Sequence, residues 1–212
     1  MSRTHFERSL IELHVRVADM ATLTEDQLRS AMIALKNRDA VLAQEVIKND
    51  ERVDLLENRI EHECVSLIAL QQPIAKDLRL VTAVLKMITD IERVADQAAD
   101  ICELMISELP NLTITIPSTI LEMGNYAAGM VHDAVHAYLQ QDEEQARGVI
   151  ERDERMDDWF EQMTGYLCDL LKSGAEPRQV IKLAYVAKYL ERVADHATNV
   201  AEWALYRLIG ER

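Results

Sequence analysis

The residues of this chain best suited to chemistry are carboxylates that recur four positions apart in a duplicated motif. Segments Glu92–Asp96 and Glu191–Asp195 share the sequence Glu-Arg-Val-Ala-Asp and lie 99 positions apart. Over the twelve residues that begin at each glutamate, seven are identical, which indicates an internal repeat. Residues four apart share one face of a helix, so each copy presents two carboxylates together. Such oxygen-rich faces suit hard or borderline divalent cations, and bridging carboxylates suit several ions at once.

The helix that precedes the first motif carries carboxylates at matching heights. An antiparallel hairpin that turns near Pro73 puts Asp50 level with Asp96. The same register puts Asp54 level with Glu92. Like charges held this close raise one another's pKa or recruit a cation.

The second half of the chain repeats this arrangement. A hairpin that turns near Gly174 puts Asp153 level with Asp195. It also puts Asp157 level with Glu191. We therefore predict a carboxylate cluster that binds metal in each half. The other interpretation, which stays open from the residues alone, is an acidic flank that is simply solvated.

The two predicted clusters are unequal. The first can draw on eight carboxylates: Asp50, Asp54, Glu57, Glu61, Glu92, Asp96, Asp100 and Glu103. The second retains five: Asp153, Asp157, Glu191, Asp195 and Glu202. In the second half, Phe160, Thr164 and Asn199 stand at the positions of Glu57, Glu61 and Asp100. Fewer charged oxygens bind fewer or more weakly held ions, so the first cluster is predicted to hold metal more tightly.

Apolar residues at helical spacing, interrupted by Pro, Gly and short polar breaks, predict an all-α fold with six long helices. The expected helices cover 4–36, 40–71, 75–108, 118–140, a stretch from the Gln141-Asp142 break to Lys172, and 177–208. Residues 47–54 and 150–157 also match at five of eight positions, so the second helix of each half is repeated too. We predict two tandem, similar three-helix bundles, residues 1–109 and 118–212, joined by a linker at 110–117. The alternative is one irregular six-helix bundle.

Composition and charge argue against nucleic-acid-binding and membrane-spanning proteins. The net charge of −14 argues against nucleic acid, whose phosphates require a basic surface. The N-terminus carries charges where a signal peptide needs an apolar stretch, and no run approaches the roughly 20 apolar residues of a membrane span. Cys64, Cys102 and Cys168 are odd in number and set among apolar helical residues. We interpret them as buried thiols of a cytoplasmic protein.

Two motifs suggest enzymes and both lack a required residue. Segment His132–His136 has histidines four apart, but Asp133 occupies the position at which a zinc protease needs glutamate as general base. A ferritin-like di-metal oxidase needs Glu-x-x-His pairs, and no histidine of this chain has a glutamate three residues before it. We therefore predict a protein that is not an enzyme. A metal-storage or carboxylate-bridged di-metal oxidase-like helical protein remains the alternative.

With both motif helices laid out, the chain resembles the PhoU family of phosphate-specific transport system accessory proteins. The resemblance spans the whole length and rests on Thr4–Glu7, Asn49–Asp54, Gln72–Arg79 and Tyr189–Glu202. It implies two similar three-helix bundles. It also implies metal clusters on Asp50, Asp54, Glu92, Asp96, Asp100, Asp153, Asp157, Glu191, Asp195 and, more weakly, Asn199. Glu57, on the same flank of its helix as Asp50 and Asp54, is a further candidate ligand from the residues themselves. Iron, zinc, manganese or magnesium, as divalent or trivalent ions, are the expected metals. The family usually has Gly where this chain has Ala95 and Ala194, a small change that we expect the fold to accommodate.

The resemblance further implies a function. PhoU-like proteins are adaptors that negatively regulate phosphate uptake and phosphate-starvation signalling. The implied partners are the ATPase subunit of the phosphate ABC transporter, the phosphate-sensing histidine kinase and a second copy in a homodimer. Contact with the membrane is then expected only through these partners.

Overall fold

The computed structural model describes residues 3–108 and 113–210, and every regular element within them is an α-helix. The helices are α1 (Arg3–Asn37), α2 (Ala40–Gln71), α3 (Lys76–Glu108), α4 (Ser118–Gln140), α5 (Glu143–Glu151), α6 (Asp153–Lys172) and α7 (Pro177–Ile209). The all-α prediction is confirmed, and most boundaries fall within one residue of those expected. None of the described helices is long and apolar enough to cross a membrane.

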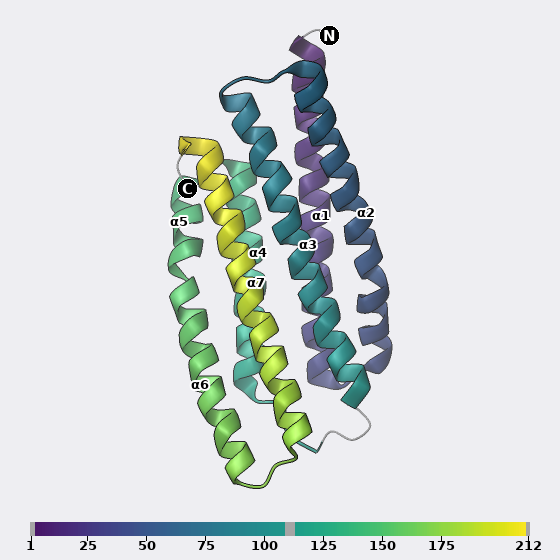
Figure 1. The fold of residues 1–212 in the computed structure, drawn as a ribbon, viewed down its shortest axis with the longest axis vertical. Coiled ribbons are helices and arrows are strands. Elements are labelled where there is room, and N and C mark those ends of the chain that lie inside the picture. The colour runs from purple at the N-terminus through teal and green to yellow at the C-terminus, as the bar shows by residue number, and fades with distance from the viewer. Residues whose placement is uncertain (1–2, 109–112, 211–212) are drawn as a thin grey trace.

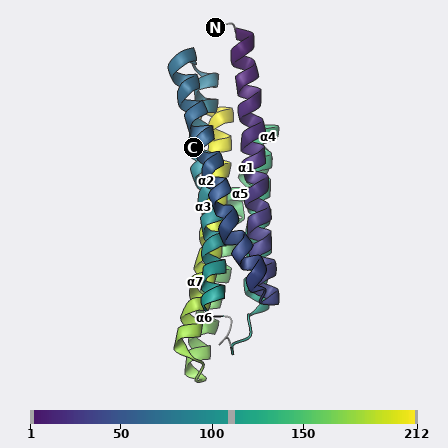
Figure 2. The same ribbon diagram turned by 90° about the vertical axis from the view of Figure 1, so that its right-hand side faces the viewer.

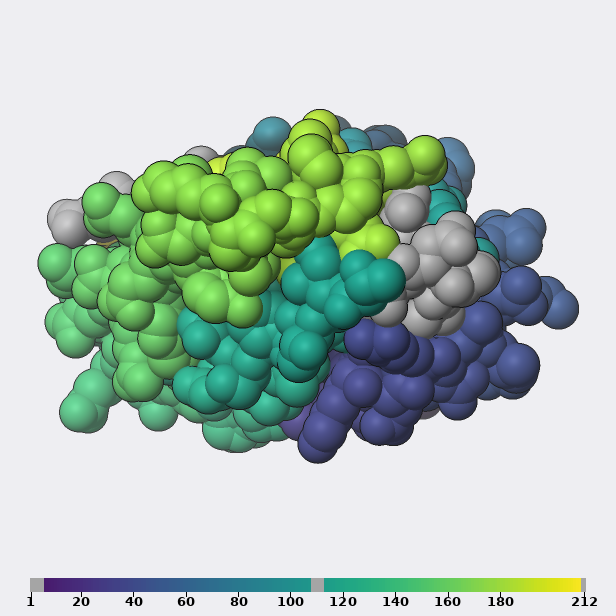
Figure 3. Space-filling view, turned by 90° about the horizontal axis from the view of Figure 1, so that it is seen from below, coloured from purple at the N-terminus to yellow at the C-terminus, as the bar shows by residue number. Residues whose placement is uncertain are grey.

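The two halves of the chain lie side by side as an elongated slab (Figures 1 and 2). Helices α1, α2 and α3 form one three-helix unit, and α4, the α5–α6 pair and α7 form the other. Across the boundary, α3 packs on α7 and α1 packs on α4, which leaves α2 and α6 at opposite edges (Figure 1). The view along the long axis shows α6 and α7 on one side and the start of α2 on the other (Figure 3). The two motif helices are therefore neighbours at the centre.

Local sequence signals explain where the helices begin and end. The Asp39 side chain caps α2 by accepting hydrogen bonds from the backbone N–H groups of Val41 and Leu42, both at 3.0 Å. Helix α2 ends at Gln71 and is capped by Gln72, which adopts a left-handed conformation with φ 47° just before Pro73. Gly174, with φ 90°, makes the tight turn between α6 and α7, where a side chain would be strained.

The predicted fifth helix is divided, which corrects the expectation of a single helix to Lys172. Helix α5 ends at Glu151 and α6 begins at Asp153. The backbone N–H of Arg152, between them, donates to Val149 O at 3.1 Å, so the turn there is tighter than an α-helix. The Arg152 side chain donates to Asp133 on α4 at 2.5 Å, and its carbonyl accepts a hydrogen bond from Tyr126 at 3.3 Å. These contacts with α4 hold the break in place.

The described part of the predicted linker, residues 113–117, docks on the start of α7. The buried Gln179 side chain accepts hydrogen bonds from the backbone N–H and the hydroxyl of Thr113, both at 3.0 Å. It also accepts from the N–H of Ile114 at 3.3 Å. The rest of the predicted linker, and the predicted outer limits of the two units, extend beyond the described residues.

One apolar core runs through both units without interruption. Ala95 and Ala194, the small residues at the centre of the duplicated motif, are fully buried in it. Cys64 and Cys102 are buried as expected, whereas Cys168 is exposed, so the prediction of a third buried thiol was wrong. Cys168 lies on α6, an edge helix that packs on its neighbours along one side only.

Two helical glycines give a matched test of this packing. A methyl at the buried Gly124 would lie 2.8 Å from Cγ of Met32 and closer still to the rest of that side chain, whereas one at Gly165 would meet nothing within 4 Å. We expect Gly124→Ala to lower the free energy of unfolding by about 1–3 kcal/mol through overpacking. Gly165→Ala should raise it by roughly 0.5–1 kcal/mol through helix propensity. Chemical denaturation measures both, and a gain at both positions would contradict a tight α1–α4 contact.

Candidate metal-binding clusters

The first cluster lies where α2 faces α3. Asp50 on α2 is half-buried and accepts a hydrogen bond from Nε2 of Gln27 on α1 at 3.0 Å. Partial burial raises the pKa of Asp50 to about 6, although the hydrogen bond from Gln27 opposes this rise. Repulsion from nearby carboxylates adds to it, most strongly from Asp96 and then from Asp54 and Asp100. The α2–α3 hairpin therefore brings Asp50 and Asp96 together in the register that the sequence predicted.

Glu92 is the carboxylate of this cluster whose negative charge is least compensated by its surroundings. Its side chain is only 15% exposed, and its Oε2 atom, 3.5 Å from Arg93 Nε, receives no hydrogen bond. Burial first, and then repulsion from Asp96, Glu57 and Asp54, raises the pKa of Glu92 to about 7, although Arg93 opposes the shift. The half-exposed Arg93 directs its hydrogen bond to Asp96, at 2.8 Å, and so compensates Glu92 only in part.

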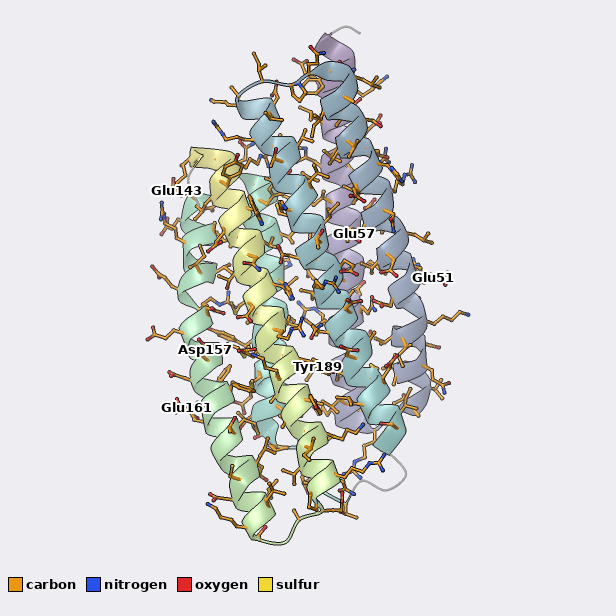
Figure 4. All side chains as sticks on the ribbon, viewed as in Figure 1. Glu51, Glu57, Glu143, Asp157, Glu161 and Tyr189 are labelled. Carbon is orange, nitrogen blue, oxygen red and sulfur yellow. The ribbon has the colours of Figure 1, made fainter. Side chains whose placement is uncertain are left out.

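Glu57 and Asp100 complete the first cluster at its two ends. Glu57 accepts a hydrogen bond from Thr89 on α3 at 3.0 Å and lies between α2 and α3, whereas Glu51 points away from the bundle (Figure 4). Burial and the neighbouring carboxylates Glu61 and Asp54 raise the pKa of Glu57. Burial, with repulsion from two carboxylates of its own helix, likewise raises the pKa of Asp100.

The second cluster has the same plan between α6 and α7. Partial burial raises the pKa of Asp195 to about 6, with Glu191 and Asp153 as its strongest like-charged neighbours. The pKa of Asp153 is raised by burial and then by Asp157 and Glu191. Lys188 forms an ion pair with Glu191, so a lysine occupies part of the role that Arg93 has in the first cluster.

Asn199 faces the other unit instead of α6. Its amide nitrogen donates to Oδ1 of Asp90 on α3 at 3.1 Å, and Nδ1 of His196 lies 2.9 Å from the same oxygen. Both His196 and Asp90 have side chains only 16% exposed. Sequence reasoning did not single out Asp90. The signal available was the 99-residue repeat, which aligns Asp90 with Tyr189 and so marks a position where the two halves differ.

The carboxylates are near one another without forming a closed coordination shell. Within residues 3–108 and 113–210, no three His, Cys, Asp or Glu side chains stand in a group that could hold a metal ion as they are placed. The donor set nevertheless suits a cation, because its groups are all oxygens and Glu92 has a buried oxygen that lacks a donor. Chemically, the arrangement is two repulsive carboxylate clusters, one per repeat, beside a shared core.

Comparisons with known proteins agree with this duplicated architecture. The PhoU domain family matches the chain twice, at residues 17–105 and 120–204. The crystal structure of PhoU from Pseudomonas aeruginosa superimposes with a TM-score of 0.92 at 29% identity, covering 97% of this chain and 99% of that one. The phosphate transport system regulatory protein PhoU from Streptococcus pneumoniae gives a TM-score of 0.91 at 25% identity over 97% and 98% of the chains.

Curated sequences agree over the full length. A PhoU homolog of Clostridium acetobutylicum, named a phosphate-specific transport system accessory protein, is 33% identical over 100% of this chain and 98% of its own. The homolog from Aquifex aeolicus is 38% identical over 96% and 93%. Fold and site define a two-repeat helical protein with paired carboxylate clusters. The chain belongs to the PhoU family.

Burial of the carboxylates predicts a pH dependence of stability. The pKa of Glu92 rises from an ordinary 4.5 to about 7 on folding, so protonated Glu92 favours the folded state. Its contribution to stability is fully present below about pH 4.5 and is lost as the pH rises through 7. In the presence of a chelator, Glu92→Gln should therefore raise the free energy of unfolding at pH 8 by roughly 1–3 kcal/mol and change it little at pH 4.

Denaturant titrations at the two pH values measure this difference. Glu51→Gln is the matched control because Glu51 is exposed on α2 and points away from the cluster (Figure 4). An equal gain in the free energy of unfolding in the two variants, or a gain for Glu92→Gln that does not depend on pH, would contradict a raised pKa for Glu92.

Proposed function

We propose that this protein is a regulatory accessory protein of phosphate transport. In this role it restrains the phosphate ABC transporter when phosphate is plentiful and keeps the partner sensor kinase from activating phosphate-starvation genes. The observation that carries the proposal is the agreement with PhoU proteins over 97% of the chain, in both sequence and fold. The relative from Escherichia coli K12, named a phosphate-specific transport system accessory protein, is 28% identical over 97% of this chain.

The physical form of the molecule supports an adaptor that works by contact instead of catalysis. The chain forms a long slab with a net charge of −14, which favours partners that present basic surfaces. Exposed apolar side chains such as Ile74 and Leu70, 78% and 71% exposed, offer further contact area near the α2–α3 turn. The proposed partners are the transporter ATPase subunit and the histidine kinase. Homodimer formation and a cytoplasmic location stay predictions.

We further propose that the two carboxylate clusters hold metal ions. In the first repeat, Asp50, Asp54, Glu57, Glu92, Asp96 and Asp100 would supply the ligands, and in the second Asp153, Asp157, Glu191 and Asp195. The raised pKa values of Asp50, Glu92 and Asp195 support this, because a cation would relieve the repulsion that produces part of each shift. Asn199 is the weakest candidate ligand, since its amide is engaged by Asp90.

The alternative of a metal store or di-metal oxidase receives less support from the geometry. Its carboxylates would lie inside a four-helix bundle. Here the carboxylates flank the core: Glu92 and Asp96 are half-buried, while Val94 and Ala95 between them are buried. We therefore favour a regulatory or structural role for the metal.

A deletion strain tests the regulatory proposal. In abundant phosphate, loss of the gene should switch on alkaline phosphatase and raise phosphate uptake, and the restored gene should return both to the parental level. A strain in which neither quantity changes would argue against this role. A strain carrying the control variant Glu51→Gln should behave as the parent, because that side chain is exposed and points away from the bundle (Figure 4).

Metal content tests the inequality of the clusters. Asp96→Asn removes a carboxylate from the larger set and Asp195→Asn one from the smaller. With the first cluster holding metal more tightly, Asp96→Asn should remove more of the metal that survives mild purification, with affinity falling by about tenfold or more. Elemental analysis per chain measures this, again with Glu51→Gln as control. Equal losses in the two variants would contradict the ranking.

A further inference from the structure

Helix α4 carries a pair of exposed histidines outside both carboxylate clusters. His132 and His136 are four residues apart, on adjacent turns of one face. Their rings are stacked, with centroids 6.1 Å apart and planes inclined by 18°. Neither histidine has a role in the proposed function.

The first imidazole is anchored by helix α1. Nδ1 of His132 lies 3.1 Å from Oε2 of Glu25, whose side chain is only 16% exposed. An ionised carboxylate can only accept a hydrogen bond, so the proton of this contact belongs to His132 Nδ1. In the neutral ring, Nε2 then carries the free lone pair.

The second imidazole is anchored by helix α5 through a chain of polar contacts. Nε2 of Gln145 donates to Oδ1 of Asp133 at 3.4 Å, and Asp133 also accepts from Arg152 at 2.5 Å. This orientation leaves the amide oxygen of Gln145 to face His136, whose Nδ1 lies 2.8 Å away. An amide oxygen accepts only, so His136 too carries its proton on Nδ1 and has Nε2 free.

The helices that carry the two anchors, α1 and α5, both pack on α4 and lie on either side of it (Figure 1). The two nitrogens of an imidazole ring point in different directions, so a hydrogen bond at Nδ1 leaves the Nε2 atom of each histidine unengaged by its anchor. A hydrogen bond from the second ring nitrogen to a carboxylate or amide oxygen is also the arrangement that fixes and strengthens histidine ligands at metal sites.

We propose that His132 and His136 form a binding site for one borderline divalent cation, with Cu²⁺ bound most tightly and Zn²⁺ or Ni²⁺ less so. Imidazole nitrogen suits these ions, whereas the carboxylate clusters offer oxygen alone. Water completes the coordination, since no group of three ligating side chains is found among the described residues. The site is therefore open and exchangeable. It also spans both repeats, because Glu25 belongs to the first and both ligands to the second.

The test is a Cu²⁺ titration of the untagged full chain, cleared of metal beforehand, followed by calorimetry and by electron paramagnetic resonance. We expect one ion per chain whose spectrum shows coupling to nitrogen. His132→Ala and His136→Ala should each weaken this binding at least about tenfold, and Glu25→Gln should weaken it by about tenfold, as loss of a supporting group does. All of these side chains lie at or near the surface, and circular dichroism checks that each variant is folded.

Matched controls separate this site from others. His62→Ala removes an exposed histidine of α2, and Glu122→Gln alters an exposed glutamate of α4. Both should bind Cu²⁺ as the parent does. Nitrogen-coupled binding that survives His132→Ala and His136→Ala, or that falls equally with His62→Ala, would overturn the proposal.

Discussion

Within each repeat, two neighbouring helices hold several carboxylates on flanks that are partly shielded from water. The packing of these helices must tolerate the resulting loss of hydration and the repulsion between the negative charges. The carboxylates cannot move apart, because the same helical turns supply the core. In α3, Glu92 and Asp96 stand before and after Val94 and Ala95 in the sequence, and these two apolar residues are buried. Separating the acidic groups would therefore require the core to open. Burial, followed by a repulsion that Arg93 relieves only in part, keeps the pKa of Glu92 at about 7.

The contact between α3 and α7 shows how the two copies have diverged. Within it, one oxygen of Asp90 accepts a hydrogen bond from Asn199 of α7 and lies beside Nδ1 of His196 of the same helix. The repeat maps Asp90 onto Tyr189 and Asn199 onto Asp100. At this mapped position the structure places Asp100, Tyr189 and Arg192 within electrostatic reach of one another. Both mapped positions therefore lie where the repeats meet, with hydrogen bonds to Asp90 at one of them and the charges of Asp100 and Arg192 at the other.

Much of the fold could be predicted from the sequence because its signals are local and repeated. Apolar residues at helical spacing predicted the helices, a short polar break and Pro73 marked where α2 begins and ends, and the hairpin register followed from the turn near residue 73. The division at Arg152 could not be predicted, because it depends on contacts with Asp133 and Tyr126 on another helix.

The same distinction applies to the sites. The proximity of Asp50 and Asp96 could be predicted because both residues lie in one helical hairpin, where their distances from the turn along the chain set the register. The orientation of Asn199 was not found, because its partner Asp90 is 109 residues away on a helix of the other repeat. The sequence alone also gave no means of placing Glu25 beside His132, 107 residues apart. Contacts between the repeats depend on how two whole units pack, and no local pattern encodes that.

The packing of α3 against α7 also brings a charge of the second repeat close to the first carboxylate cluster. Arg192 lies within the second copy of the motif, yet its charge offsets part of the rise in the pKa of Asp100 in the first, a rise caused mainly by burial. A cation that binds beside Asp100 would act on Arg192 through the same field and in the opposite direction, because it repels the guanidinium that the carboxylate attracts. Arg192 directly follows Glu191 of the second cluster in sequence. If the proposed metal ions bind, occupancy of the first cluster would change the electrostatic environment of Arg192, and so of the helix turn that carries Glu191, without any movement of the helices.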